Sequence, residues 1–352
     1  MDVSAFKKRI IITGGAGFIG SNLLRLLVPK YSNYLFVNLD CLTYAGNLGN
    51  LVGLEEHPNY LFEKVSILDR DELERCFRAY APDGVIHLAA ESHVDRSIEW
   101  PADFIATNVT GTYHLLECAR AAAETRSFRF HHISTDEVFG SVPEGQSATE
   151  LSPYRPNSPY AASKAASDHL VRAYHVTYKL DTIISHSTNN YGPYQFPEKL
   201  IPLVIRNAQE GIPVPVYGDG LQSRDWIHVT DHCRAIDLLF HKGKSGGVYN
   251  VSSGSESQNI DLVRKLCQIL GERLGRKNIE SLISLVTDRP GHDRRYSLDS
   301  SRIRNELGWK PDIGLDEGLL QTLDWYLNNR TWLQDCLSGD YLRYYERMYS
   351  NR

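Results

Sequence analysis

Ser134-Thr135-Asp136-Glu137 places hydroxyl and carboxyl groups side by side in the chain, and Glu137 lies 23 residues before Tyr160. Tyr160 and Lys164 are four residues apart behind Ser158-Pro159, a typical helix start. On a helix this spacing puts both side chains on one face, where we expect the ammonium group to lower the pKa of the phenol. The pair favours proton removal from an alcohol, and the adjacent acids add a proton donor and acceptor for removing water.

Each of these motifs also has a purely structural interpretation. A Tyr-x-x-x-Lys pair occurs often by chance, and Ser-Thr-Asp is common in helix caps and turns. The apolar run that ends at Ile133 predicts a buried strand, however, so the residues after it should face a crevice at the carboxyl edge of a sheet. Their position therefore favours the catalytic interpretation.

A glycine-rich turn near the N-terminus predicts a dinucleotide site. Gly14, Gly17 and Gly20 follow a predicted strand and open a predicted helix, which allows pyrophosphate to approach the helix N-terminus closely. Asp40 ends the next predicted strand, 20 residues after Gly20, where a carboxylate would hydrogen-bond both ribose hydroxyls. Because no arginine follows Asp40 directly, we expect NAD rather than NADP.

Apolar runs alternate with amphipathic stretches, which predicts an α/β fold with a Rossmann-like, doubly wound parallel sheet. After Asn189 prolines break this rhythm, and a smaller, discontinuous α/β substrate-binding domain is expected. The NAD-binding domain should cover residues 1–188 and about 229–252, and the nucleotide-sugar-binding domain 189–228 and about 253–352. Strands are predicted at 9–13, 34–39, 60–64, 84–88, 128–134, 182–187 and 248–251, and helices at 18–28, 71–80, 101–124, 159–180 and 231–241.

Bulk properties exclude several classes of protein. The 352 residues carry a formal net charge of -5, which argues against non-specific nucleic-acid binding. No segment approaches the roughly 20 apolar residues of a membrane span. The six cysteines are scattered, which favours a reducing cytoplasm over a zinc site or a disulfide framework. His131 and His132 are consecutive strand residues that point to opposite faces, so no metal site is expected.

At this level of detail the chain closely resembles the dTDP-glucose 4,6-dehydratases of the extended short-chain dehydrogenase/reductase superfamily. The glycine and Tyr-Lys motifs are shared across that superfamily, whereas the Asp-Glu pair is more specific. The resemblance covers nearly the whole chain, in blocks at residues 13–20, 42–47, 89–97, 134–137, 160–164, 189–193, 196–202, 224–226 and 288–296.

The resemblance implies a mechanism with NAD as the cofactor and a nucleotide sugar as the substrate. Tyr160 would remove the proton from the 4-hydroxyl while NAD takes hydride from carbon 4. Glu137 would then abstract the carbon-5 proton, Asp136 would protonate the departing 6-hydroxyl, and the hydride would return to carbon 6. Thr135 would hold the 4-oxygen. Mutual repulsion between the two acids would push their pKa values apart, and our hypothesis is that Asp136 is the neutral one.

The resemblance also assigns binding residues. The catalytic set is Thr135, Asp136, Glu137, Tyr160 and Lys164. The cofactor set is Gly14, Gly17, Phe18, Ile19, Gly20, Asp40, Leu42, Thr43, Ser66, Ile67, Leu88, Ala89, Ala90, Thr107, Tyr160, Lys164 and Asn190. The substrate set is Ser92, Thr135, Asn189, Lys199, Leu200, Pro215, Tyr217, Arg224, Asn259, Asp288, Arg289, His292 and Tyr296, with Arg224 as the strongest diphosphate candidate.

Three positions depart from the family pattern. Ser66 replaces an aspartate near the adenine, Phe139 replaces a tyrosine, and 186–188 differ from a common Cys-Ser ending. Family members pair through two long helices, here 101–124 and 159–180, so we expect a homodimer. The keto sugar feeds rhamnose and several other deoxysugars, among which the sequence does not choose.

Other functions remain open at this stage. A UDP-glucose 4,6-dehydratase differs only in the base of its substrate. A nucleotide-sugar 4-epimerase needs no acid-base pair, and a decarboxylase would release carbon dioxide. An NAD-sensing scaffold would be expected to lack the tyrosine, the lysine or the carboxylates.

Overall fold

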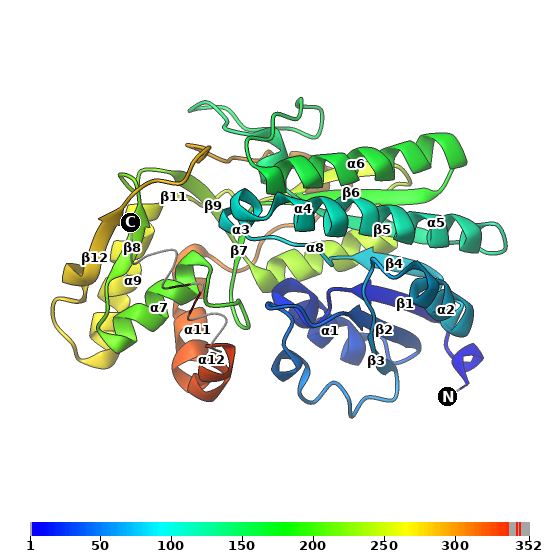
Figure 1. Ribbon diagram of the computed structural model, residues 1–352, viewed down its shortest axis with the longest axis horizontal. Coiled ribbons are helices and arrows are strands. Elements are labelled where there is room, and N and C mark those ends of the chain that lie inside the picture. Colours follow the sequence, from blue (N-terminus) through cyan, green and yellow to red (C-terminus); the bar gives the residue numbers. More distant parts are fainter. Residues whose placement is uncertain (1, 338–342, 344, 346–352) are drawn as a thin grey trace.

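The computed structural model describes residues 2–337, 343 and 345, and its largest element is a seven-stranded parallel sheet (Figure 1). The strand order is β10-β6-β5-β4-β1-β2-β3, so the chain starts in the middle and winds outward in both directions. This order confirms the predicted doubly wound fold. The strands are β1 (Lys8–Thr13), β2 (Tyr34–Asp40), β3 (Tyr60–Lys64), β4 (Gly84–His87), β5 (Arg129–Thr135), β6 (Asp181–Ser187) and β10 (Gly247–Val251).

Helices cover both faces of this sheet, which is why most residues of its strands are buried. On one face α1 (Phe18–Lys30) packs against α8 (Val229–Lys242). On the other face α5 (Thr112–Ala123) lies beside both α2 (Arg70–Tyr80) and α6 (Pro159–Tyr178). Two separate hydrophobic cores result, one on each side of the sheet.

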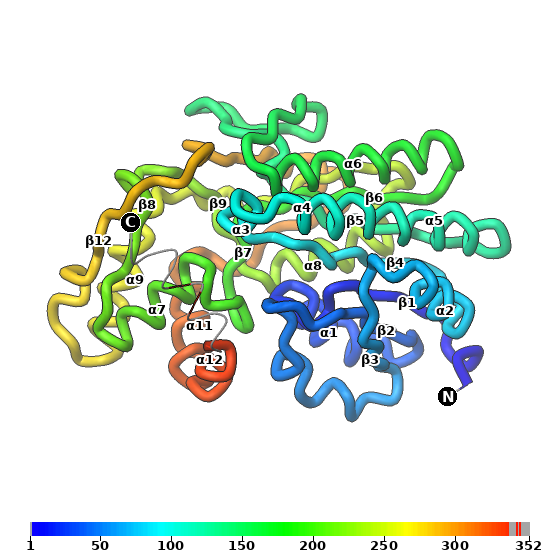
Figure 2. Tube along the Cα trace, in the orientation of Figure 1, coloured from blue at the N-terminus to red at the C-terminus, as the bar shows by residue number. Residues whose placement is uncertain are grey.

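A smaller lobe lies beyond the carboxyl ends of the strands, at the opposite end of the molecule from the N-terminus (Figures 1 and 2). It has its own core and two small sheets, ordered β11-β9-β7 and β12-β8. Its strands are β7 (Asn189–Tyr191), β8 (Val214–Tyr217), β9 (Ser223–His228), β11 (Glu256–Gln258) and β12 (Ile283–Val286). Its helices are α7 (Leu200–Glu210), α9 (Asn259–Leu274), η5 (Ile279–Leu282), α11 (Leu315–Asn328) and α12 (Arg330–Cys336), while α10 (Ser301–Leu307) packs on β10.

The segment from Pro101 to Glu124 departs from the predicted continuous helix. A short α4 (Pro101–Phe104) passes into a π-helix over Ile105–Gly111 before α5 begins. Within the π-helix the buried Asn108 side chain exchanges hydrogen bonds with the backbone N–H and carbonyl of Glu91, each 2.9 Å long. These bonds tie the helix to the loop after β4, and π-bulges are common at such functional positions. The remaining short helices are η1 (Val3–Ala5), η2 (Leu48–Leu51), α3 (Val94–Glu99) and η4 (Asp136–Phe139).

Within the described ranges, no helix combines the length and the apolar character needed to cross a bilayer.

We predict that Gly20→Ala destabilises the fold, because α1 starts in direct contact with the glycine turn. A Cβ at residue 20 would lie 2.2 Å from the Gly14 carbonyl oxygen, so the helix would have to move away from the sheet. The free energy of unfolding should fall by about 1–3 kcal/mol in urea denaturation. Gly314→Ala, whose Cβ would meet no atom within 4 Å, is the control and should cost about 1 kcal/mol or less. Equal losses in the two variants would contradict this explanation.

Candidate active site

One cavity of about 390 Å³ runs along the carboxyl edge of the main sheet. It extends from the glycine turn after β1, past the ends of β2 and β4, to the end of β5 and the start of α6. Parallel strands bring their carboxyl ends to one edge, so residues from distant segments meet there.

The glycine turn approaches the end of β4 more closely than any side chain would allow. Gly14 has a φ of +73°, and a Cβ on it would lie 2.7 Å from the Ala89 backbone nitrogen. Asp40 closes the other side of the turn, accepting hydrogen bonds from the backbone N–H groups of Ala16 (2.9 Å) and Leu42 (2.8 Å). Each carboxylate oxygen therefore keeps a lone pair free for another donor.

Tyr160 and Lys164 face the same cavity from α6, as their spacing predicts. We expected Lys164 to lower the pKa of the Tyr160 phenol, and this expectation is wrong for this structure. Burial, followed by the negative charge of Glu137, raises the pKa of Tyr160, while a hydrogen bond between Tyr160 and Thr135 opposes the rise. The Lys164 Nζ instead donates to the Ile133 carbonyl at 2.7 Å and contacts His132 Nε2 at 3.3 Å, so its charge is directed at β5.

Asp136 and Glu137 follow β5 as the first residues of η4, and both line the cavity. Burial raises the pKa of Asp136 well above its usual range, and the neighbouring Glu137 raises it further. Burial also raises the pKa of Glu137, but Arg289, Arg224 and Lys199 act in the opposite direction. The Oδ2 atom of Asp136 has no hydrogen-bond partner among the described residues, so it is available to a ligand.

Three basic side chains lie close to this acid pair. Arg224 donates to the backbone carbonyls of Ser223 and Asp293, at 2.8 Å each, and its guanidinium lies over the Tyr296 ring. Arg289 makes a bidentate ion pair with Asp95 at 3.0 and 2.8 Å. Lys199 lines the cavity and donates to the Ser92 carbonyl at 3.1 Å. The acidic chain therefore gathers positive charge at this place.

The structure brings most of the predicted site residues together. All five predicted catalytic residues line the cavity, and so does every predicted cofactor residue except Leu42. The backbone N–H of Leu42 donates a hydrogen bond to Asp40. Among the predicted substrate residues, the cavity wall contains Ser92, Thr135, Asn189 and Lys199. The others lie outside that wall: Leu200, Pro215, Tyr217, Arg224, Asn259, Asp288, Arg289, His292 and Tyr296.

The three departures from the family pattern lie at different depths. Ser66 lines the cavity and accepts a hydrogen bond from the Leu68 N–H. Phe139 and His186 lie behind the wall, and their rings contact each other with centroids 4.9 Å apart.

Two buried acids near the site were missed in the sequence. Glu198 accepts hydrogen bonds from Tyr44 (3.1 Å) and Arg96 (3.2 Å). Asp168 lies one turn after Lys164, so the series Tyr160, Lys164, Asp168 repeats at i, i+4. That repeat was the available signal, because it places all three on one helix face. Among the described residues, these two acids included, no cluster of three or more His, Cys, Asp or Glu is placed to hold a metal ion.

Comparisons with known proteins agree with this geometry. The family model described as GDP-mannose 4,6 dehydratase matches residues 11–322. The dTDP-glucose 4,6-dehydratase of Neisseria meningitidis is 51% identical over 346 residues, covering 95% of this chain and 97% of the relative. That of Xanthomonas campestris is 53% identical over 340 residues, covering 94% and 96%.

Solved structures show the same relationship. The dTDP-glucose 4,6-dehydratase of Streptomyces venezuelae, determined with NAD bound, superposes with a TM-score of 0.87 at 47% identity and covers 93% of this chain and 99% of its own. A Thermus thermophilus UDP-glucose 4-epimerase in complex with NAD superposes with a TM-score of 0.82 at 31% identity, covering 91% and 99%. By fold, site and sequence, the chain belongs to the family of the dTDP-glucose 4,6-dehydratases.

Proposed function

We propose that the chain is an NAD-dependent dTDP-glucose 4,6-dehydratase that forms dTDP-4-keto-6-deoxyglucose and water. The single observation that carries this proposal is the buried Asp136-Glu137 pair, which shares one cavity with Tyr160 and with the glycine turn. An oxidation alone would need no second acid-base pair at that point.

The residues of the glycine turn and of Asp40 fit NAD. The turn leaves no space for a Cβ at Gly14 or Gly20, so a pyrophosphate can approach the backbone at the start of α1. The free lone pairs of Asp40 suit the two hydroxyls of an adenosine ribose, and its charge would repel a 2′-phosphate. A bound NAD would supply the hydride transfer that oxidises carbon 4 of the sugar and reduces carbon 6.

The protein side chains would handle the protons. The phenolate form of Tyr160 would take the proton of the 4-hydroxyl, and Thr135, which is hydrogen-bonded to the same phenol, lies close to the position of the 4-oxygen. Lys164 supplies a positive charge in the cavity wall. The resulting ketone acidifies carbon 5, which makes proton abstraction by a carboxylate feasible.

Asp136 and Glu137 divide the elimination between them. Asp136 has the more strongly raised pKa and no partner on Oδ2, so it is the neutral donor for the departing 6-hydroxyl. Glu137 faces three cations, which favour its ionised form and hence its role as the base at carbon 5. Two carboxyls in one desolvated place resist ionising together.

The smaller lobe would bind the nucleotide diphosphate. Arg224 is held by backbone carbonyls and by the Tyr296 ring, so it is preorganised for a diphosphate oxygen, and Lys199 reaches the same region from the cavity wall. We propose residues 1–188 and about 229–252 as the NAD-binding domain and the remainder as the sugar-nucleotide domain. The position of β10 in the main sheet supports this division.

Two related functions are weaker candidates. A nucleotide-sugar 4-epimerase shares the fold, the glycine turn and the Tyr-Lys pair, but it has no use for a buried acid beside a base. A UDP-glucose 4,6-dehydratase would use the same chemistry, and only the nucleotide pocket separates it from the proposed enzyme.

We also propose that the enzyme works as a homodimer in the cytoplasm, in deoxysugar biosynthesis such as the route to rhamnose. All six cysteines are free, in agreement with a reducing compartment. Apolar side chains remain exposed on the face formed by the π-helix, α5 and α6, among them Ile105 and Val176, each 50% exposed. A second copy on this face would cover them.

Turnover of purified protein tests the proposed reaction. With dTDP-glucose we expect a product that is lighter by one water and carries a 4-keto group by mass spectrometry and NMR. UDP-glucose should react more slowly, because its base lacks the thymine methyl and its ribose carries an extra hydroxyl. Formation of dTDP-galactose without loss of water would instead identify an epimerase.

Asp136→Asn should slow the loss of the 6-hydroxyl, since an amide cannot supply the acidic proton. We expect kcat for dehydration to fall about 10²–10⁴-fold. Exchange of the carbon-5 proton with deuterated solvent should continue, because Glu137 and Tyr160 are unchanged. Asp324→Asn removes an exposed carboxylate on α11 and serves as the matched control with unchanged kcat. Dehydration at the normal rate in Asp136→Asn would assign the acid to another group.

Val176→Asp should dissociate the proposed dimer, because it places a charge in the middle of an apolar contact. Light scattering should give twice the mass of one chain for the unchanged protein and the mass of one chain for the variant. Leu285→Asp, at a 61% exposed position on β12, should remain dimeric. A monomeric unchanged protein would refute the assembly.

A further inference from the structure

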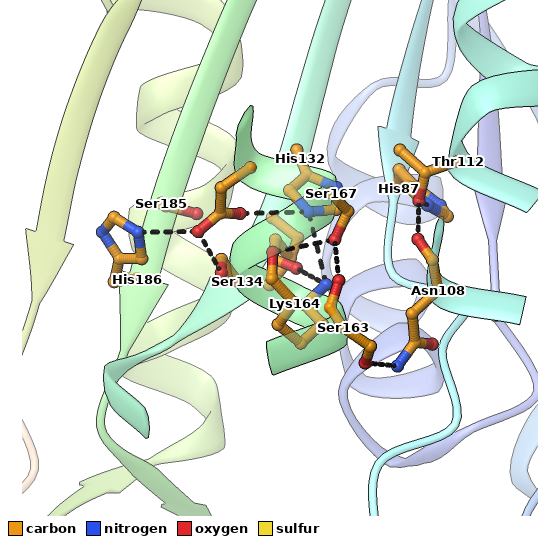
Figure 3. Close-up of polar contacts among 12 residues, drawn as sticks. His87, Asn108, Thr112, His132, Ser134, Ser163, Lys164, Ser167, Ser185 and His186 are labelled. Atoms are coloured by element: carbon orange, nitrogen blue, oxygen red, sulfur yellow. Dashed lines mark hydrogen bonds and ion pairs between the residues drawn. The ribbon is translucent and has the colours of Figure 1, made fainter. Parts of the chain in front are cut away.

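A buried polar network lies directly behind the cavity wall, and Asp168 is its centre. The Asp168 side chain is 1% exposed, and its Oδ2 atom accepts hydrogen bonds from Ser134 Oγ at 2.9 Å and the Tyr154 hydroxyl at 3.0 Å. His186 Nε2 lies 3.1 Å from the same oxygen. Figure 3 shows the labelled members of this network converging from β5, β6 and α6.

The other oxygen of Asp168 faces the lysine of the active site through a histidine. Asp168 Oδ1 is 3.3 Å from His132 Nε2, and the same nitrogen is 3.3 Å from Lys164 Nζ. A single ring nitrogen either carries a proton or presents a lone pair. With Lys164 charged, Nε2 accepts from the ammonium. With Lys164 neutral, a protonated Nε2 donates to Asp168 instead, so the charge of Lys164 and the tautomer of His132 are coupled.

The pKa shifts of these groups indicate which of them are charged near pH 7. Burial alone would raise the pKa of Asp168, but the close contact with His132 and the hydrogen bond with His186 outweigh it and hold the carboxyl ionised. Burial lowers the pKa of Lys164 to about 8, and the charge of Asp168 opposes that loss. Burial lowers the pKa of His132 to about 4, so its ring is neutral near pH 7.

The same carboxylate also holds the strand that carries the acid pair. Ser134, which donates to Asp168, immediately precedes Thr135, Asp136 and Glu137. A shift of α6 relative to β5 would therefore move the phenol and the acids apart.

We propose that Asp168 is a positioning residue of the active site: its negative charge favours the charged form of Lys164, with His132 lying between them as the acceptor for the ammonium, and its hydrogen bond with Ser134 fixes the end of β5. The catalytic meaning of this role rests on the function proposed above, whereas the coupling to Lys164 does not. The other ionisable groups that face the network are His186 of β6, Tyr154 in the loop before α6, and His87 of β4, whose ring centroid is 5.2 Å from that of His132.

The coupling is tested on the protein without added substrate or cofactor. Competitive acetylation at a series of pH values, read by mass spectrometry of the peptide that contains Lys164, reports the pKa of this amine. In Asp168→Asn the midpoint should move to lower pH by roughly one unit or more, because a nearby negative charge is lost. Asp168→Glu keeps the charge and should restore most of the shift. An unchanged midpoint in Asp168→Asn would overturn the proposal.

The catalytic part is tested by the pH profile of dTDP-glucose dehydration. Activity that needs a charged Lys164 is lost as the pH rises through its pKa, so the alkaline limb should move to lower pH in Asp168→Asn. A merely structural residue would lower kcat or stability without moving this limb. Inactive wild-type protein would refute the proposed function and leave the acetylation result standing, so the two failures are distinguishable.

Two controls separate the proposed role from general damage. Asp237→Asn removes another buried carboxylate, which lies on α8 and pairs with Lys30 and His241. This variant should leave the titration of Lys164 and the alkaline limb of the pH profile unchanged. If Asp168→Asn fails to fold, His132 supplies a second comparison. His132→Gln can still accept from Lys164 and donate to Asp168, whereas His132→Leu can do neither. Only the leucine variant should lower the midpoint, and equal midpoints in the two variants would overturn the coupling.

Discussion

Burial of ionisable side chains at the end of β5 is the constraint on which the rest of the site depends. Asp136, Glu137, Tyr160 and Lys164 all face one desolvated cavity, where each charged form is costly unless a partner compensates it. The acids respond with raised pKa values and the lysine with a lowered one. A neutral acid beside a base follows from that environment, because the two carboxyls compete for ionisation in the same low dielectric.

The fold meets this constraint with charges from outside the sheet. Arg224 and Arg289 come from the smaller lobe; backbone carbonyls hold the Arg224 guanidinium, and Asp95 of α3 holds that of Arg289. Their positive charge favours ionisation of Glu137, which supports the proposed assignment of Glu137 as the base. Behind the wall, Asp168 provides the opposite charge for Lys164. Charged side chains of both lobes therefore act on the same buried acids, although they lie far apart in the sequence.

Much of the architecture could be predicted from local patterns. The predicted bounds of β3 match those observed. Each of the other predicted strands of the main sheet differs from the structure by one residue, at one end or, for β5, at both ends. Gly14, Gly84 and Gly247 lie at the boundaries of β1, β4 and β10, because glycine releases the backbone in a local way. The π-helix at Ile105–Gly111 was not predictable in this way, because its cause is the hydrogen bonding of Asn108 to a loop from another part of the chain. The direction of the Tyr160 pKa was wrong for a similar reason, since burial depends on what packs around the phenol.

The sequence by itself determined the parallel α/β fold and the family, and it predicted the glycine turn with Asp40 and the catalytic groups, because each depends on residue type and short spacing. Tertiary structure decided which charged and polar groups are close enough to interact. It placed Asp168 between His132, His186 and Ser134, directed Lys164 toward β5, and paired Arg289 with Asp95. Hydrogen bonds and desolvation act over a few ångströms in space, and residues that lie up to 194 positions apart in the chain meet at that range only after folding.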